Sequence, residues 1–68
     1  MGERVGEVKL YNKRKGFGII QSDERDYFFR WTDIVSPTHK HCIAGEKVLF
    51  IPQMHSRGLR ASQVVKMG

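Results

Sequence analysis

Apolar and polar residues follow one another in short runs along the 68-residue chain, and no stretch of ten or more residues shows a convincing 3.6-residue period. Short runs of this kind, separated by polar turns, are typical of strands rather than helices. The pattern therefore predicts five strands, packed as a small all-β barrel or sandwich. The predicted strands cover residues 5–11, 16–21, 27–31, 46–52 and 59–67.

Between the predicted strands lie three short polar turns and one long connection at residues 32–45. A connection of this length in a compact domain is usually functional or partly structured. Thr32 and Asp33 are of the residue types that cap the start of a short helical turn. We expect Pro52 to close the fourth strand, because proline cannot donate a hydrogen bond to the strand ladder.

Strand alternation divides the apolar residues between a buried and an exposed face. In the third predicted strand we expect Tyr27 and Phe29 to point into the core, while Phe28 and Arg30 point outward. The lone Cys42 is interpreted as a small apolar filler. The other predicted core residues are Val5, Val8, Ile20, Ile34, Val48, Phe50, Ala61 and Val64.

The charge balance favours a polyanionic partner. Twelve basic residues against seven acidic ones give a net charge of +5. In so small a chain this is the electrostatic pattern of nucleic-acid binding, although a charged surface also serves solubility. A single cysteine excludes an internal disulfide and fits a reducing, cytoplasmic compartment. We expect neither a membrane span nor a signal peptide, because the apolar runs are only a few residues long.

Residues 15–20, KGFGII, place two glycines inside one of the most apolar stretches of the chain. If Ile20 is in the core, alternation puts Phe17 and Ile19 on the outer face. An exposed phenylalanine beside basic residues is well explained as a surface on which a nucleic-acid base stacks. With Phe28 on the neighbouring strand, the pattern predicts a stacking platform with a basic rim. The two glycines are then interpreted as leaving room for the base.

Five segments, in order and at consistent spacing, resemble the motifs of cold shock domains. KGFGII resembles their first RNA-binding motif, usually K-G-F-G-F-I, and YFFRW at 27–31 resembles the second, usually V-F-V-H-F. The three other matching segments are GEVKLYN at 6–12, AGEKVLF at 44–50 and RGLRASQVV at 57–65. One such motif would be weak, but five together over residues 5–67 are a strong signal.

The resemblance implies one cold shock domain over residues 1–68, folded as a five-stranded antiparallel barrel of the OB-fold type. It implies a protein of the bacterial cytoplasm that binds single-stranded RNA and DNA. We expect it to be non-catalytic, to need no cofactor and to be a monomer. An RNA chaperone or a regulator of transcription or translation would act in this way. The nucleic-acid-binding positions that it implies are Lys9, Leu10, Tyr11, Lys15, Phe17, Ile19, Asp26, Phe28, Arg30, Trp31, His39 and Arg57.

Several of these positions depart from the family's usual residues. Leu10 stands where Trp is usual, Ile19 where Phe is usual, and His39 where Phe is common. Arg30 replaces a usual His and stays charged at every working pH. Trp31 replaces a usual Phe and offers a larger stacking face, although strict alternation would place it on the opposite side of the strand. We expect weaker binding than in a fully aromatic member, with a larger electrostatic share.

Metal binding, catalysis and protein interaction are the alternatives to nucleic-acid binding. The histidines and Cys42 form no paired ligand motif of the kind a structural zinc site needs, and adjacent His41 and Cys42 cannot face each other as a catalytic dyad. We therefore expect no metal and no enzyme activity. The alternative is a protein-interaction or oligomerisation module that keeps the fold but has weakened nucleic-acid binding. A domain-swapped dimer stays open, because residues 32–45 form a long connection.

Overall fold

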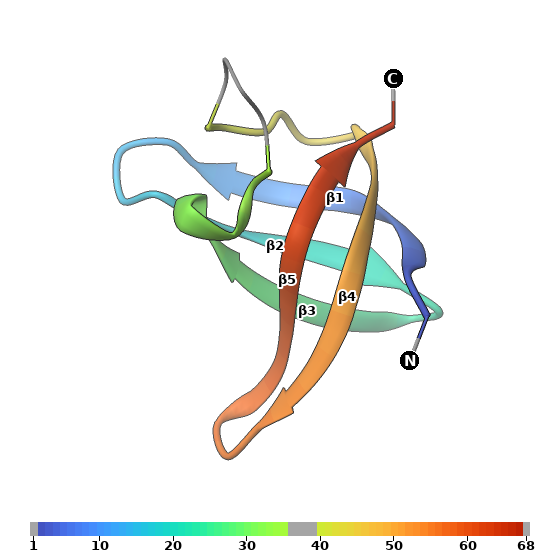
Figure 1. The fold of residues 1–68 in the computed structure, drawn as a ribbon. Helices are drawn as coiled ribbons and strands as arrows, with labels where there is room; N and C mark the ends of the chain where they lie inside the picture. Colours follow the sequence, from blue (N-terminus) through green and yellow to red (C-terminus); the bar gives the residue numbers. More distant parts are fainter. Residues whose placement is uncertain (1, 36–39, 68) are drawn as a thin grey trace.

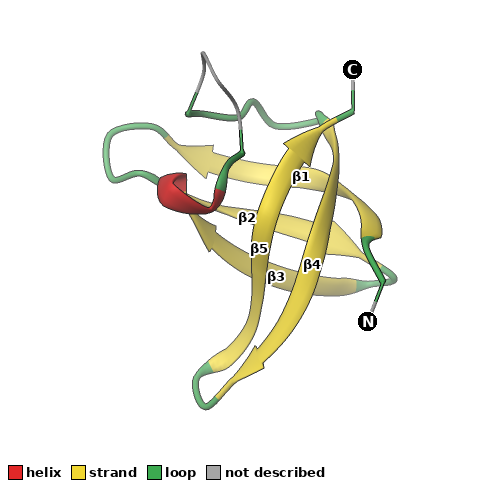
Figure 2. Ribbon diagram, viewed as in Figure 1, coloured by secondary structure: helices red, strands yellow, loops and turns green. Residues whose placement is uncertain are grey.

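The computed structural model describes residues 2–35 and 40–67 and shows a closed five-stranded barrel (Figures 1 and 2). The strands follow the barrel in the order β1, β2, β3, β5, β4. Neighbouring strands are antiparallel except β3 and β5, which pair in parallel at Phe28 and Arg60. The elements are β1 (Arg4–Asn12), β2 (Phe17–Ser22), β3 (Arg25–Arg30), the 3₁₀ turn η1 (Trp31–Asp33), β4 (Lys47–His55) and β5 (Gly58–Lys66). The predicted OB-type barrel is confirmed.

Short turns set the antiparallel register of the first three strands. Asp23 and Glu24 join β2 to β3 and both have positive φ, 51° and 63°. Two successive residues with positive φ match the right-handed twist of a hairpin. β3 continues into η1, where the Asp33 carboxylate accepts a hydrogen bond from the Arg30 backbone N–H at 2.9 Å. The predicted short helical turn is therefore present, but its N-cap residue is Arg30, and Asp33 bonds back to Arg30 from the third position of the turn.

The core lies inside the barrel and is built by the inward residues of all five strands. As predicted, Tyr27 and Phe29 are buried, and so is Cys42. The full set of buried apolar residues is Val8, Ile20, Tyr27, Phe29, Ile34, Cys42, Val48, Phe50, Ala61 and Val64. Burying side chains of this size is the main source of the domain's stability.

Two predictions about the strands are wrong. Val5 is 54% exposed, because Gly6 takes the inward position beside it: a Cβ on Gly6 would lie 2.6 Å from Ile20 Cγ2. Pro52 does not end β4, which continues to His55. The described pairing of β4 with β1 ends at Phe50, so Pro52 has a partner strand on one side only. Proline is tolerated where one edge of a strand needs no N–H donor.

Gly18 is the glycine on which the inner packing depends. It is buried, and a Cβ there would lie 2.7 Å from both the Leu10 carbonyl oxygen and the Phe29 ring. A G18A variant should therefore lose about 1–3 kcal/mol of the free energy of unfolding, the usual cost of overpacking. Urea denaturation measures this loss. G2A is the matched control, because nothing lies within 4 Å of its Cβ position; equal stabilities of the two variants would contradict the packing argument.

Candidate nucleic-acid interface

One row of outward side chains crosses four strands of the barrel. Leu10 on β1 pairs in register with Ile19 on β2, Ile19 with Phe28 on β3, and Phe28 with Arg60 on β5. Side chains at paired positions point to the same face of a sheet. Leu10 is 43% exposed, so the β1 end of this row offers a bare aliphatic surface where an aromatic ring would stack better.

The two phenylalanines predicted to lie side by side do so. Phe17 on β2 is paired with Arg30 on β3, which lies two residues from Phe28 and on the same face of the strand. The rings of Phe17 and Phe28 are stacked, with centroids 5.5 Å apart and planes 26° apart. Both rings are partly exposed, so they form an aromatic surface that a flat ligand can extend by stacking.

Two arginines lie over Phe28. The guanidinium carbon of Arg30 is 5.6 Å from the ring centroid, and that of Arg60 is 5.2 Å away. Both distances are within the range of cation–π attraction. Arg60 also pairs with Asp33, whose Oδ2 lies 3.6 Å from Arg60 Nη2. Asp33 thus accepts a hydrogen bond from the Arg30 backbone N–H and also pairs with the guanidinium of Arg60.

Arg60 is a candidate site residue that sequence reasoning did not select. On the sequence alone it could equally be a solvated arginine near the basic rim. Its place over Phe28 follows from the parallel pairing of β3 with β5, which joins residues 32 positions apart. A signal was present in the resemblance, because Arg60 lies within the matching segment RGLRASQVV.

Trp31 begins η1 and is 48% exposed, so it is available as a stacking face. Its backbone N–H donates to the Gly16 carbonyl at 2.8 Å, and its indole lies against Gly16. Gly16 has φ +73°, and a Cβ there would lie 2.6 Å from Trp31 Cδ1. The interpretation that the glycines make room for a base is wrong. Gly16 makes room for Trp31, and Gly18 makes room for Phe29.

Tyr11 lies at the inner side of the interface rather than on the platform. It pairs with Gly18, and its ring stacks on Phe29 with centroids 5.8 Å apart. The Tyr11 hydroxyl donates to the Lys40 carbonyl at 3.2 Å and so ties the segment after residue 39 to β1. Burial, with a smaller contribution from Cys42, raises the pKa of Tyr11 above its ordinary value.

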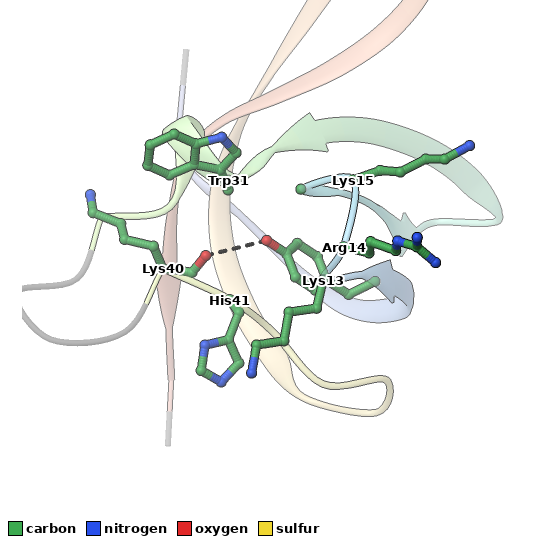
Figure 3. A pocket seen from close by; sticks show the side chains of 8 residues that line it. Lys13, Arg14, Lys15, Trp31, Lys40 and His41 are labelled. Atoms are coloured by element: carbon green, nitrogen blue, oxygen red, sulfur yellow. Dashed lines mark hydrogen bonds between the residues drawn. The ribbon is translucent and has the colours of Figure 1, made fainter.

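A basic hollow of about 360 Å³ opens next to Trp31 (Figure 3). We call it the Trp31 hollow; its lining residues are Tyr11, Lys13, Arg14, Lys15, Gly16, Trp31, Lys40 and His41. None of these described lining residues is acidic. Lys15 is among the predicted binding positions, whereas Lys13 and Arg14 are not. The structure brings all three basic residues to the rim of a hollow that has an indole at its side.

A second hollow, of about 400 Å³, lies beside Phe28, between β3 and the β4–β5 hairpin. This Phe28 hollow is lined by Phe28, Arg30, His55, Ser56, Arg57, Leu59 and Arg60. It brings the predicted residue Arg57, at the hairpin turn, next to the aromatic pair. The described lining again contains arginines and no carboxylate, so both hollows favour anionic or acceptor-rich ligands.

The remaining predicted site residues lie apart from the aromatic pair or outside the described chain. Lys9 falls at a bulge of β1, and its Nζ is 3.2 Å from Asp26 Oδ2, with both side chains about half exposed. An exposed ion pair of this kind contributes little to stability, so its members remain available to a ligand. His39 lies outside the described residues.

The arrangement of possible metal ligands and the environment of Cys42 are further chemical features of the described residues. Residues 2–35 and 40–67 contain no cluster of three His, Cys, Asp or Glu side chains that could hold a metal ion. Burial raises the pKa of the Cys42 thiol, with Lys66 and Glu46 acting in opposite directions on it. A reactive cysteine needs a lowered pKa. No helix in the described structure is long and apolar enough to span a membrane.

A closed five-stranded barrel with aromatic and basic side chains on an outer face defines the class of OB-fold domains. Within this class, the sequence model of the family described as 'Cold-shock' DNA-binding domain matches residues 4–67. The chain belongs to this family, which is a nucleic-acid-binding and non-enzymatic one.

Curated relatives match nearly the whole chain. The cold shock-like protein CspA of Vibrio cholerae is 36% identical over 65 residues, covering 93% of both chains. The major cold shock protein CspA of Bacillus cereus is 36% identical over 64 residues, covering 93% of this chain and 96% of its own. Among solved structures, drosophila Unr CSD456 has a TM-score of 0.77 at 17% identity. This match covers 98% of the chain but only 27% of the Unr structure, and it shows the fold alone.

The raised pKa of Cys42 predicts a loss of stability at alkaline pH. The unfolded thiol ionises near pH 8.5, whereas the folded thiol holds its proton to higher pH. Its contribution is therefore complete below about pH 8.5 and is lost as the pH rises through the folded pKa. Denaturation between pH 7.5 and 9.5 should show a steeper fall for the wild type than for C42A. Parallel curves, or labelling of the folded thiol as fast as a free one, would refute the buried, neutral thiol.

Proposed function

We propose that this domain binds single-stranded RNA and DNA by stacking bases on its outer aromatic face, without catalysis. The observation that carries the proposal is the stacked pair of Phe17 and Phe28 with two guanidinium groups over Phe28. Aromatic faces accept any base, and arginine adds stacking and charge. Membership of a nucleic-acid-binding family supports the same function.

The two hollows on either side of the aromatic pair suggest how a strand would lie. Trp31 would stack a further base, while Lys13, Lys15 and Arg57 would attract phosphates at the rims. Phosphate contacts are sequence-independent and release counterions, so this part of the affinity falls with salt. The exposed Leu10 and the half-buried Ile19 reduce stacking along the β1–β2 part of the face. The electrostatic share of the binding free energy is therefore large.

Binding of this kind favours the unpaired form of a nucleic acid. A protein that binds single strands but not duplexes shifts a weak hairpin toward the open form by mass action. No nucleotide hydrolysis or metal is needed. We infer that the domain acts in this way as a cytoplasmic RNA chaperone, or regulates transcription or translation by the same binding.

Trp31 reports directly on the proposed binding. Titration with a short pyrimidine-rich DNA strand should quench its fluorescence, because its exposed indole stacks on a base. Repeating the titration at several salt concentrations should give a log–log slope of roughly −2 to −3, at about 0.7 per contact for about three to four phosphate contacts. No binding at low salt by a folded sample would refute the proposal. Sedimentation that then showed self-association would favour the interaction module.

Removing the central ring tests the stacking itself. F28A should weaken binding of the same strand about 5-fold to 150-fold, which corresponds to about 1–3 kcal/mol for one stacked base. I43A is the matched control, because Ile43 is a 64% exposed apolar residue that lines neither hollow. Circular dichroism and urea denaturation must show that both variants are folded in the assay. Equal binding by F28A and I43A would exclude Phe28 as a stacking residue.

A further inference from the structure

The Phe28 hollow has an unusual distribution of hydrogen-bonding groups for a site that would accept any base. Its aromatic side is Phe28, and its charged walls are Arg30, Arg57 and Arg60. A guanidinium group carries five N–H donors in a fixed fork and has no acceptor. The charged wall formed by these three arginines therefore consists of donors only, whereas His55 and Ser56 on the rest of the lining carry groups that can also accept.

The forks of Arg30 and Arg60 are placed at the ring where the base would stack. Both guanidinium carbons lie within 5.6 Å of the Phe28 centroid. Asp33 positions the Arg60 fork, because its Oδ2 pairs with Arg60 Nη2; at Arg30 it accepts the backbone N–H and does not contact the guanidinium in this way. Asp33 and Arg60 are both mostly buried at this contact, which restricts the movement of the guanidinium. A fork that is already held in place loses less freedom when it binds an edge.

Arg60 also has an unmet donor. Its Nε atom is buried and has no hydrogen-bond partner among the described residues. A buried donor without an acceptor is unfavourable. A ligand that brings two neighbouring acceptors would satisfy further N–H donors of the held guanidinium.

The four bases differ in what they would present to such a donor-only wall. Guanine offers two adjacent acceptors, O6 and N7, which an arginine fork binds in bidentate fashion. Thymine and uracil offer the single O4 acceptor on this edge. On the same edge adenine offers the single acceptor N7 beside its N6 amino donor, and cytosine offers the N4 amino donor, so neither gives the fork two adjacent acceptors there. The wall therefore ranks guanine first and disfavours adenine and cytosine.

We propose that the Phe28 hollow is a guanine-preferring base site, with Arg60 as its specificity-determining residue and Asp33 as a positioning residue. This inference rests on the proposed function, because it names the base that the stacking face selects at one position. The rest of the face keeps the tolerance for sequence that stacking gives.

The test uses the intact protein and short thymidine strands. One guanine is moved through each position of a DNA heptamer, and each strand is compared with its adenine counterpart by Trp31 fluorescence. At the position that binds best, guanine is then replaced by 7-deazaguanine, which keeps the ring but lacks the N7 acceptor. We expect guanine to bind about fivefold or more tightly than adenine, and much of that preference to be lost with 7-deazaguanine.

R60K is the decisive variant, because lysine keeps the charge but has no planar fork. It should weaken binding of the all-thymidine strand, because Arg60 belongs to the binding face, but it should weaken binding of the guanine strand further, so that most of the preference for guanine over 7-deazaguanine is lost. R25K is the matched control: Arg25 is an exposed arginine at the start of β3 that lines neither hollow. It should keep the wild-type preference.

Each outcome bears on one proposal or on both. Wild-type protein that binds thymidine strands without any guanine preference overturns the guanine site and leaves the proposed function standing. An R60K variant that weakens all strands equally makes Arg60 a general contact and also overturns the inference. Wild-type protein that binds no strand at all overturns the proposed function and the guanine site together.

Discussion

The parallel pairing of β3 with β5 is the contact on which the candidate interface depends. It closes the barrel, and it places Arg60 beside Phe28. A parallel bridge between Ile34 and Val64 continues the same junction past η1, so that the turn carrying Trp31 and Asp33 is attached to β5. Without this closure, the aromatic pair would remain on β2 and β3, but the hollow next to it would lose one wall.

Charge is arranged around this junction so that the two hollows stay basic. The acidic residue Asp33 already contacts Arg60 and the Arg30 backbone. Two other acidic residues, Asp23 and Asp26, are at the β2–β3 hairpin and pair with Arg4 and Lys9. A chain with a modest net charge of +5 can thus present a locally stronger positive field where a strand would bind.

Much of the fold could be predicted from the sequence, because local alternation decides which face of a strand is buried. Tyr27 and Phe29 inside, with Phe17 and Phe28 outside, follow from period-2 patterning alone. The prediction for Val5 fails because it follows hydrophobicity against the same alternation, which puts Gly6 inward and Val5 outward once Val8 is in the core. Gly6 occupies an inward position that hydrophobicity would assign to Val5.

The part of the site that sequence did not predict depends on contacts between distant segments. Arg60 reaches Phe28 only through barrel closure, and nothing in the local spacing around residue 60 indicates that pairing. The two glycines of KGFGII lie near the aromatic face, as expected, but they do not serve to leave room for a base. Their small size is required by Trp31 and Phe29, which are the protein's own rings.

The alternation of Gly18 and Ile19 in β2 has a consequence for how such a domain can change. Gly18 faces the core and tolerates no added side chain, whereas Ile19, next to it, belongs to the outer row. Ligand affinity therefore depends on one side of this strand, and thermodynamic stability depends on the other. The outer row can exchange aromatic for aliphatic residues, and so retune the strength and base preference of binding, while the barrel beneath it stays the same.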